Sequence, residues 1–172
     1  MKKYLTLTFI IIAIAVSAKA EIVGGATVGY LNDSKEGYYT ARLGYQFKSA
    51  GTAAHIVELE VGYSSDSDAG AKISLVPVTL NYRTEIPTSE NWGVYLGAGL
   101  GQGNVKVRYW AFNGSDWTFV GQAFAGVSYK ISDSAKLTLG ARYVSFDNVD
   151  FLGSSIEVGD DVSFELGLGF KF

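Results

Sequence analysis

Apolar and polar residues alternate strictly along the last segment of the chain. One face carries Val162, Phe164, Leu166, Leu168, Phe170 and Phe172, and the other carries Asp161, Ser163, Glu165, Gly167, Gly169 and Lys171. Successive side chains of a β-strand point to opposite faces of the sheet. This period of two therefore predicts a two-sided strand and argues against a helix.

The same period recurs throughout the chain after residue 20, and helical periodicity is convincing in none of it. We predict eight strands: Ile22–Leu31, Tyr38–Phe47, His55–Ser64, Ala71–Glu85, Trp92–Gln102, Trp117–Ile131, Lys136–Phe146 and Asp161–Phe172. The phase slips by one residue around Ile73–Val76, ahead of Pro77, which indicates a bulge or a strand end.

The connections between these segments alternate in length. Three are short and turn-like: Lys48–Ala54, Ile86–Asn91 and Ser132–Ala135. Four are longer or more varied: Asn32–Gly37, Ser65–Gly70, Asn104–Asp116 and Asp147–Asp160. Short turns at one end and longer loops at the other are typical of an outer-membrane β-barrel. The pattern predicts an all-β fold, an eight-stranded antiparallel up-and-down barrel with both termini on its periplasmic side.

The N-terminus has the three parts of a secretory signal. Lys2 and Lys3 form a positive region, Leu5–Val16 an apolar run, and Ser17–Ala20 a small-residue cleavage site. The run is shorter than the ~20 apolar residues that a membrane-spanning helix needs. We predict a cleaved signal peptide at residues 1–20, Sec-type export, and a barrel domain at 21–172.

Composition narrows the class of protein further. The chain has 21 Gly, 11 Tyr and 10 Phe, while only 18% of its residues are charged. This profile suits many short strands better than a helical bundle. The net charge of −3 and the lack of a Lys/Arg cluster argue against nucleic-acid binding. The absence of cysteine is compatible with an oxidising compartment.

Alternation alone does not say which face of the barrel points outward, because a soluble lipocalin-like barrel also alternates. A Gly-, Ser- and Thr-rich face is a poor surface for a soluble domain, whereas Leu, Val, Phe and Ala suit lipid. Aromatic residues also gather near the strand ends. Toward the longer loops lie Tyr30, Tyr38, Tyr39, Tyr63, Trp110, Trp117, Phe119 and Phe146, and toward the short turns Phe47, Tyr82, Trp92, Tyr129, Phe170 and Phe172. Two aromatic belts predict a membrane barrel.

Three runs resemble a known family. They are Trp92–Gly103 (WGVYLGAGLGQG), Phe124–Ile131 followed by Leu137–Tyr143, and the closing Gly167–Phe172 (GLGFKF). They are similar to strands of the small eight-stranded outer-membrane barrels of the OmpX, OmpA-barrel and opacity-protein types, over the whole chain after residue 20. The resemblance implies a location in the bacterial outer membrane. It also implies that Phe172, with Phe170 before it, is the signal read by the barrel-assembly machinery.

Candidate catalytic chemistry is sparse. His55 is the only histidine, it opens a strand at the short-turn end, and no His-x-Ser occurs as a nucleophile pair would need. The glycines of Gly97–Gly103 do not match a phosphate-binding loop, because Gln102 stands where the third glycine would fall. Loop aspartates match no calcium-loop spacing. We expect no enzymatic activity, no cofactor and no metal.

Inward-facing charges carry the strongest residue-level signal. Those in the inward phase are Arg42, Glu58, Glu60, Arg83, Glu85, Lys130, Lys136, Arg142, Glu165 and Lys171. Of these, Arg42, Glu58, Glu60, Arg142 and Glu165 are expected near mid-height. We predict Arg142 directly across from Glu165, and Arg42 beside Glu58 or Glu60. Such a network suits a polar plug that fills a narrow lumen, and the alternative is a gated pore.

Two hypotheses for function remain open. The first is a structural or surface-interaction role, adhesin-like, through extracellular loops in which Trp110, Phe112 and Trp117 are the candidate contacts. The second is a narrow porin-like channel for ions or small solutes. The partners expected are outer-membrane lipid and lipopolysaccharide, the barrel-assembly machinery, and an extracellular ligand on the loops.

Overall fold

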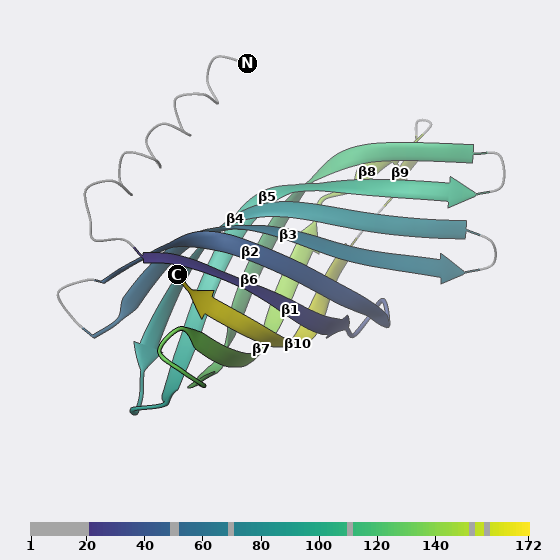
Figure 1. Cartoon of the computed structure of the whole chain (residues 1–172). Coiled ribbons are helices and arrows are strands. Elements are labelled where there is room, and N and C mark those ends of the chain that lie inside the picture. Colours follow the sequence, from purple (N-terminus) through teal and green to yellow (C-terminus); the bar gives the residue numbers. More distant parts are fainter. Residues whose placement is uncertain (1–20, 49–51, 69–70, 110–111, 152–153, 157–158) are drawn as a thin grey trace, which may run out of the picture.

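The computed structural model describes residues 21–48, 52–68, 71–109, 112–151, 154–156 and 159–172. Eight antiparallel strands close into one barrel, as predicted, in the order β1-β10-β7-β6-β5-β4-β3-β2 (Figure 1). Its strands are β1 (Glu21–Leu31), β2 (Glu36–Lys48), β3 (Ala54–Asp68), β4 (Ala71–Pro87), β5 (Trp92–Tyr109), β6 (Phe112–Lys130), β7 (Ala135–Phe146) and β10 (Gly159–Lys171). The predicted signal peptide lies outside the described residues.

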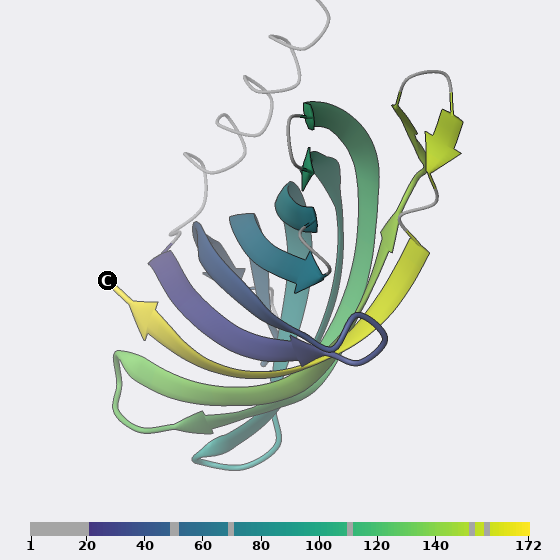
Figure 2. The ribbon, with the colours of Figure 1, turned by 90° about the vertical axis from the view of Figure 1, so that its right-hand side faces the viewer.

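The two ends of the barrel differ. The turn end holds Glu21, Phe172, the facing ends of β2 and β3, and the connections 88–91 and 131–134 (Figure 1). The opposite end, the hairpin end, carries the connections β1–β2, β3–β4, β5–β6 and β7–β10. Between β7 and β10, β8 (Val149–Phe151) and β9 (Ser154–Ile156) form a separate two-stranded sheet at the hairpin end, with β8 next to β6 (Figure 2).

Two segments predicted as loops are instead paired strands. Pairing between β3 and β4 continues to Asp68 opposite Ala71, and pairing between β5 and β6 continues to Tyr109 opposite Phe112. The interpretation as loops was therefore wrong for Ser65–Asp68, Asn104–Tyr109 and Phe112–Asp116, and the remaining residues of these two connections lie outside the described residues. Their polar composition resembles a loop, but neighbouring strands still satisfy each other's backbone groups in a long hairpin.

The strands are staggered around the barrel. A path that starts at Glu21 and steps from each residue to the one directly opposite it on the next strand goes once around the barrel. It returns to β1 at Leu31, ten residues from where it began. A closed sheet with such a stagger has strands tilted by roughly 35–45° from the barrel axis. An eight-stranded barrel has an interior just wide enough for its own side chains. Inward-facing residues from distant strands are therefore brought into contact.

Burial follows the predicted two faces. In β10, Ser163 and Glu165 are buried, whereas Phe164, Leu166 and Leu168 are exposed on the outer wall. The wall is thus apolar outside and polar inside, the reverse of a soluble barrel. No helix among the described residues is long and apolar enough to cross a membrane.

Exposed aromatic side chains form two belts on the outer wall. Near the hairpin end they are Tyr30, Tyr39, Tyr63, Trp117, Phe119, Tyr143 and Phe164, and near the turn end Tyr45, Tyr82, Trp92, Tyr129, Phe170 and Phe172. Two predicted members are wrong: Tyr38 and Phe146 are 1% and 8% exposed and face inward. They pack with Leu31, Val120 and Val144 in a small apolar cluster inside the barrel.

The predicted phase slip near Pro77 is also absent. The register of β3 against β4 is the same on both sides of it, with Val61 opposite Val78 and Ser64 opposite Leu75. Leu75 breaks the apparent pattern because it packs against the internal apolar cluster. The interior changes from polar to apolar at this height, and the strand keeps its phase.

Tyr95 needs a glycine slot in the wall. It lies directly opposite Gly126, which lies opposite Gly140 on the next strand. A Cβ built on Gly126 would lie 2.5 Å from the Tyr95 hydroxyl and would overlap the backbone oxygen of Leu139. Because a backbone atom cannot swing away as a side chain can, only glycine fits here.

We expect Gly126→Ala to destabilise the barrel by about 1–3 kcal/mol, the usual cost of overpacking. Gly121→Ala is the matched control on the same strand, because its nearest atom would be Leu100 Cδ2 at 3.8 Å. Urea unfolding in lipid vesicles, followed by the gel mobility of the folded form, measures both. Equal stability of the two variants would show that the slot does not constrain the wall.

Candidate functional site in the barrel lumen

Eight ion-paired side chains from five strands point into the barrel. The basic members are Arg42, Arg83, Lys136 and Arg142, and the acidic members are Glu58, Glu60, Glu85 and Glu165. Equal numbers of the two signs leave the set without net charge. Isolated buried charges would each cost several kcal/mol, so charge balance is what permits so many in one interior.

Arg142 is the centre of the first group and is 2% exposed. Its Nε donates to Glu165 Oε1 at 2.6 Å and its Nη2 to Glu165 Oε2 at 3.1 Å. Its Nη1 and Nη2 donate to the two oxygens of Glu60 at 2.5 and 3.1 Å. One guanidinium thus holds two carboxylates by paired hydrogen bonds, the geometry in which such bonds are strongest.

Gln122 completes this group. Its Oε1 accepts a hydrogen bond from Arg142 Nη1 at 2.7 Å, and its Nε2 donates to Glu60 at 3.0 Å and to Asn81 at 2.7 Å. The ring of Phe124 lies 5.0 Å from the Arg142 guanidinium carbon. Contact with an aromatic face stabilises a desolvated cation. Arg142 is therefore fixed by neighbours on several sides of the barrel.

The second group lies nearer the turn end. Glu58 lies 3.1 Å from Arg83 Nη2 and 3.7 Å from Arg42 Nε. Glu85 lies 3.6 Å from Arg83 Nε and accepts a hydrogen bond from Lys136 Nζ at 2.6 Å. Ion pairs therefore continue from mid-barrel to the mouth.

The predicted direct opposition of Arg142 and Glu165 is wrong. Arg142 pairs with Ser163 across β7 and β10, and Glu165 pairs with Gly140. Both charged residues keep the same inward face, and the long arginine side chain reaches diagonally to the carboxylate. Arg42 lies directly opposite Glu60 but makes its ion pair with Glu58.

Sequence reasoning missed the contact across the lumen between Arg142 and Glu60. The two belong to β7 and β3, which are not neighbours in the wall. It also missed Gln122 as the residue that joins them. The available signal was the similar height of several inward charges in a barrel too narrow to keep them apart.

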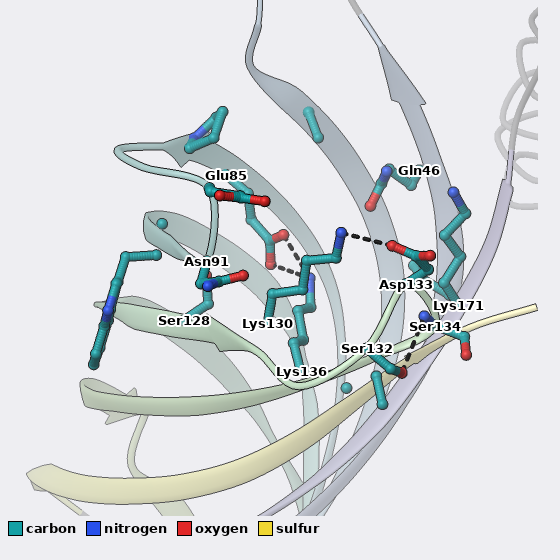
Figure 3. Close-up of a pocket in the computed structure, with 18 of the residues that line it drawn as sticks. Gln46, Glu85, Asn91, Ser128, Lys130, Ser132, Asp133, Ser134, Lys136 and Lys171 are labelled. Atoms are coloured by element: carbon teal, nitrogen blue, oxygen red, sulfur yellow. Dashed lines mark hydrogen bonds and ion pairs between the residues drawn. The ribbon is translucent and has the colours of Figure 1, made fainter.

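A cavity of about 380 Å³ opens at the turn end of the barrel. Figure 3 shows the ion pair of Lys136 and Glu85 at this mouth, with Lys130 and Asp133 paired nearby. Deeper in the interior, three buried polar atoms of the described residues lack a hydrogen-bond partner: Asn81 Nδ2, Arg83 Nε and Ser163 Oγ. Water is the usual partner of such groups.

The remaining candidate residues lie outside the lumen. Trp117 is 59% exposed on the outer wall, opposite Asn104 and within the hairpin-end belt. Trp110 lies outside the described residues, and for Phe112 only the backbone is described. Phe170 and Phe172 are exposed at the turn end, where the Phe172 backbone N–H donates to Ile22.

His55 lies at the turn end of β3 and faces outward. Its Nδ1 lies 2.6 Å from the Tyr82 hydroxyl and 3.4 Å from Thr84 Oγ1, and its ring stacks on Phe47 and Tyr82. These are the contacts of an aromatic-belt residue. Among the described residues, no three His, Asp or Glu side chains gather as a metal site.

Solved structures share this fold. Neisserial surface protein A matches with a TM-score of 0.62 and 15% identity, over 89% of this chain and 97% of that one. Ail, the attachment invasion locus protein of Yersinia pestis, matches at 0.56 and 15%, over 89% and 97%. The outer membrane enzyme PagL matches at 0.55 and 16%, over 86% and 98%. At these identities the likeness establishes the fold alone, and the fold carries both enzymes and other proteins.

A family model gives a further comparison. No curated protein matches the sequence. The model for the outer membrane protein beta-barrel domain matches residues 6–172. This match covers almost the whole chain and agrees with the closed barrel, the apolar outer wall and the two aromatic belts. The chain therefore belongs to the outer-membrane β-barrel protein family.

Proposed function

We propose that this outer-membrane barrel is a non-enzymatic surface protein that conducts little and acts through the hairpins at its hairpin end. The observation that carries the proposal is Arg142, which bridges Glu60 on one wall and Glu165 beside it. Together with Gln122 these side chains occupy the middle of a narrow lumen. An ion would have to break paired, buried hydrogen bonds to pass.

The orientation follows from export. If residues 1–20 direct the chain through the inner membrane and are then removed, the turn end faces the periplasm and the hairpins face outward. In that orientation Phe172 lies on the periplasmic side, as the resemblance to barrel-assembly signals requires. The long β3–β4 and β5–β6 hairpins then form the part of the protein furthest from the cell.

An adhesin-like role is the form of surface interaction that we favour. Ail, whose name refers to attachment and invasion, has the same fold. Phe112 pairs with Tyr109 at the end of the β5–β6 ladder, beyond the aromatic belt, and Trp110 follows Tyr109 in the sequence. Apolar side chains beyond the membrane are costly unless they pack on a partner. The position of Trp117 favours membrane anchoring over partner contact.

The position of His55, the single histidine of the chain, supports a non-enzymatic function. A hydrolytic enzyme with this fold would need a nucleophile and a base close together in a cleft. The ring nitrogen of His55 instead bonds Tyr82 on the outer wall at the turn end.

A narrow channel is the second candidate. It is favoured by the unpartnered polar atoms of Asn81, Arg83 and Ser163 and by the cavity at the turn end. Water entering from this mouth would reach the second ion-pair group first. Arg142 and its partners would still separate it from the hairpin end.

Planar-bilayer recording of the refolded protein separates these functions. We expect little steady conductance from the wild type. Glu165→Gln should be leakier or less stable, because it removes one partner of the buried Arg142. Gly121→Ala serves as a folded control on the wall. Large, stable single-channel currents from the wild type would overturn the proposal and favour the channel.

Surface binding is tested on bacteria that display the protein. Replacing Trp110 and Phe112 together by Ser should abolish adhesion to epithelial cells and to immobilised extracellular matrix. Trp117→Ser, which removes a single aromatic side chain from the belt, should weaken membrane insertion and, compared at equal surface levels, leave adhesion intact. Unchanged adhesion of the Trp110/Phe112 variant at equal surface levels would end the adhesin-like version.

A further inference from the structure

Three basic residues lie together on the outer wall near the hairpin end. They are Lys72 on β4 and Lys106 and Arg108 on β5, and all three are exposed. Lys72 is an odd number of residues away from the inward-facing Arg83 on β4, as Lys106 and Arg108 are from the inward-facing Tyr95 on β5. Their side chains therefore point away from the lumen. They form what we call the outer basic patch.

The patch is unbalanced in charge. Lys72 lies directly opposite Arg108, and Lys106 lies opposite Ser74, two residues further along the same face. Like charges directly opposite each other destabilise a sheet. Among the described residues none of the three has an ion pair, whereas the rim residues Lys130 and Lys171 pair with Asp133 and Glu21.

No described side chain on the outer face beside the patch carries an opposite charge. The outward residues paired beside the patch on β3 and β6 include Ser65, opposite Ser74, and Ser115, opposite Lys106. The described acidic residue on the outer wall at this end is Asp160 on β10, three strands away from β5 in the barrel order. Its carboxylate instead accepts a hydrogen bond from Tyr143. Binding of an external anion would offset the repulsion between these three positive charges.

The height of the patch indicates what that anion is. Trp117, in the hairpin-end belt, lies opposite Asn104, and Lys106 is two residues further along β5. Two residues correspond to roughly 7 Å along a strand and about 5 Å of height at the usual tilt. Aromatic belts mark the edge of the hydrocarbon, and the headgroup layer extends roughly 5–7 Å beyond it. Lys106 therefore lies at the level of lipid phosphates. Lys72 and Arg108 lie two residues further out, and their long side chains can extend back along the wall to the same level.

We propose that Lys72, Lys106 and Arg108 bind the phosphate groups of a phosphorylated glycolipid of the lipid A class in the leaflet at the hairpin end. This rests on the outward orientation of the hairpins proposed above. Arginine can hold a phosphate by two parallel hydrogen bonds, and the two lysines add point charges on either side. Serines around the patch add hydroxyl donors without repelling the lipid. The barrel is thereby fixed in depth on the side formed by β4 and β5.

The test measures lipid binding to the refolded, full barrel in neutral detergent by native mass spectrometry. The probes are bisphosphorylated lipid A, the same lipid after enzymatic removal of its phosphates, and millimolar inorganic phosphate as competitor. The patch variant is Lys72→Gln, Lys106→Gln and Arg108→Gln together. The charge-matched control is Lys35→Gln, Lys130→Gln and Lys171→Gln together, and gel mobility checks that both variants fold.

We expect the patch variant to bind bisphosphorylated lipid A at least about tenfold more weakly than the wild type, since each basic residue near a membrane surface contributes appreciably. The control should bind like the wild type, and the dephosphorylated lipid should not distinguish the variants. Wild-type binding should also weaken as salt rises. Equal binding by the patch variant and the wild type would refute the site. Equal losses of lipid affinity in the patch variant and the control would mean that overall charge, and no specific site, accounts for binding. Full displacement of the lipid by inorganic phosphate would mean that the patch binds free anions. Because no cells are involved, these outcomes are independent of the adhesion experiment.

Discussion

The burial of one guanidinium between two carboxylates organises this protein. Arg142 cannot lie in a dry barrel without counter-charges, and Glu60 and Glu165 cannot lie there without it. An eight-stranded wall brings these groups within hydrogen-bond distance although they come from different strands. The set is held in place by Gln122, which accepts from Arg142 and donates to Glu60. Replacing any one member leaves its neighbours with unpaired charge.

The outer wall meets the opposite demand. In lipid every backbone polar group must be satisfied within the protein, and a closed sheet does this without free edges. Leu, Val and aromatic side chains can then face outward, as Leu166 and Phe164 do on β10. Small residues inside let the wall close around large side chains, as Gly126 and Gly140 do for Tyr95. Beyond the belt the same outer face becomes basic at Lys106 and Arg108.

The parts of this structure that depend on local alternation could be predicted from sequence. The two faces of β10 follow directly from its period of two, and the shared inward phase of Arg142 and Glu165 follows from the same rule. Tyr38 and Phe146 share the inward phase of Arg42 and Arg142, four residues away on the same strands. The internal apolar cluster still escaped prediction, because apolar residues near the strand ends resemble residues of the outer wall. For the same reason Leu75 suggested a slip of phase that does not exist.

Contacts between strands that are distant in the wall were beyond sequence reasoning. Register between neighbours follows from a hairpin, but Arg142 and Glu60 meet only because of the stagger of the whole barrel. A shift of two residues in the β7–β10 register was enough to displace the expected partner of Arg142 from Glu165 to Ser163. The hairpin extensions at Asp68 and Tyr109 escaped prediction because polar strands resemble loops in composition.

The central claim is that charges on opposite walls hold each other across the lumen. A double-mutant cycle of Arg142→Gln and Glu60→Gln, with unfolding free energies measured in lipid vesicles, tests it most directly. The account predicts that the two losses are strongly non-additive, with a coupling energy of about 2–3 kcal/mol, the upper part of the range for directly contacting residues. Losses that add to within about 0.5 kcal/mol would mean that the two side chains do not interact, and would contradict it.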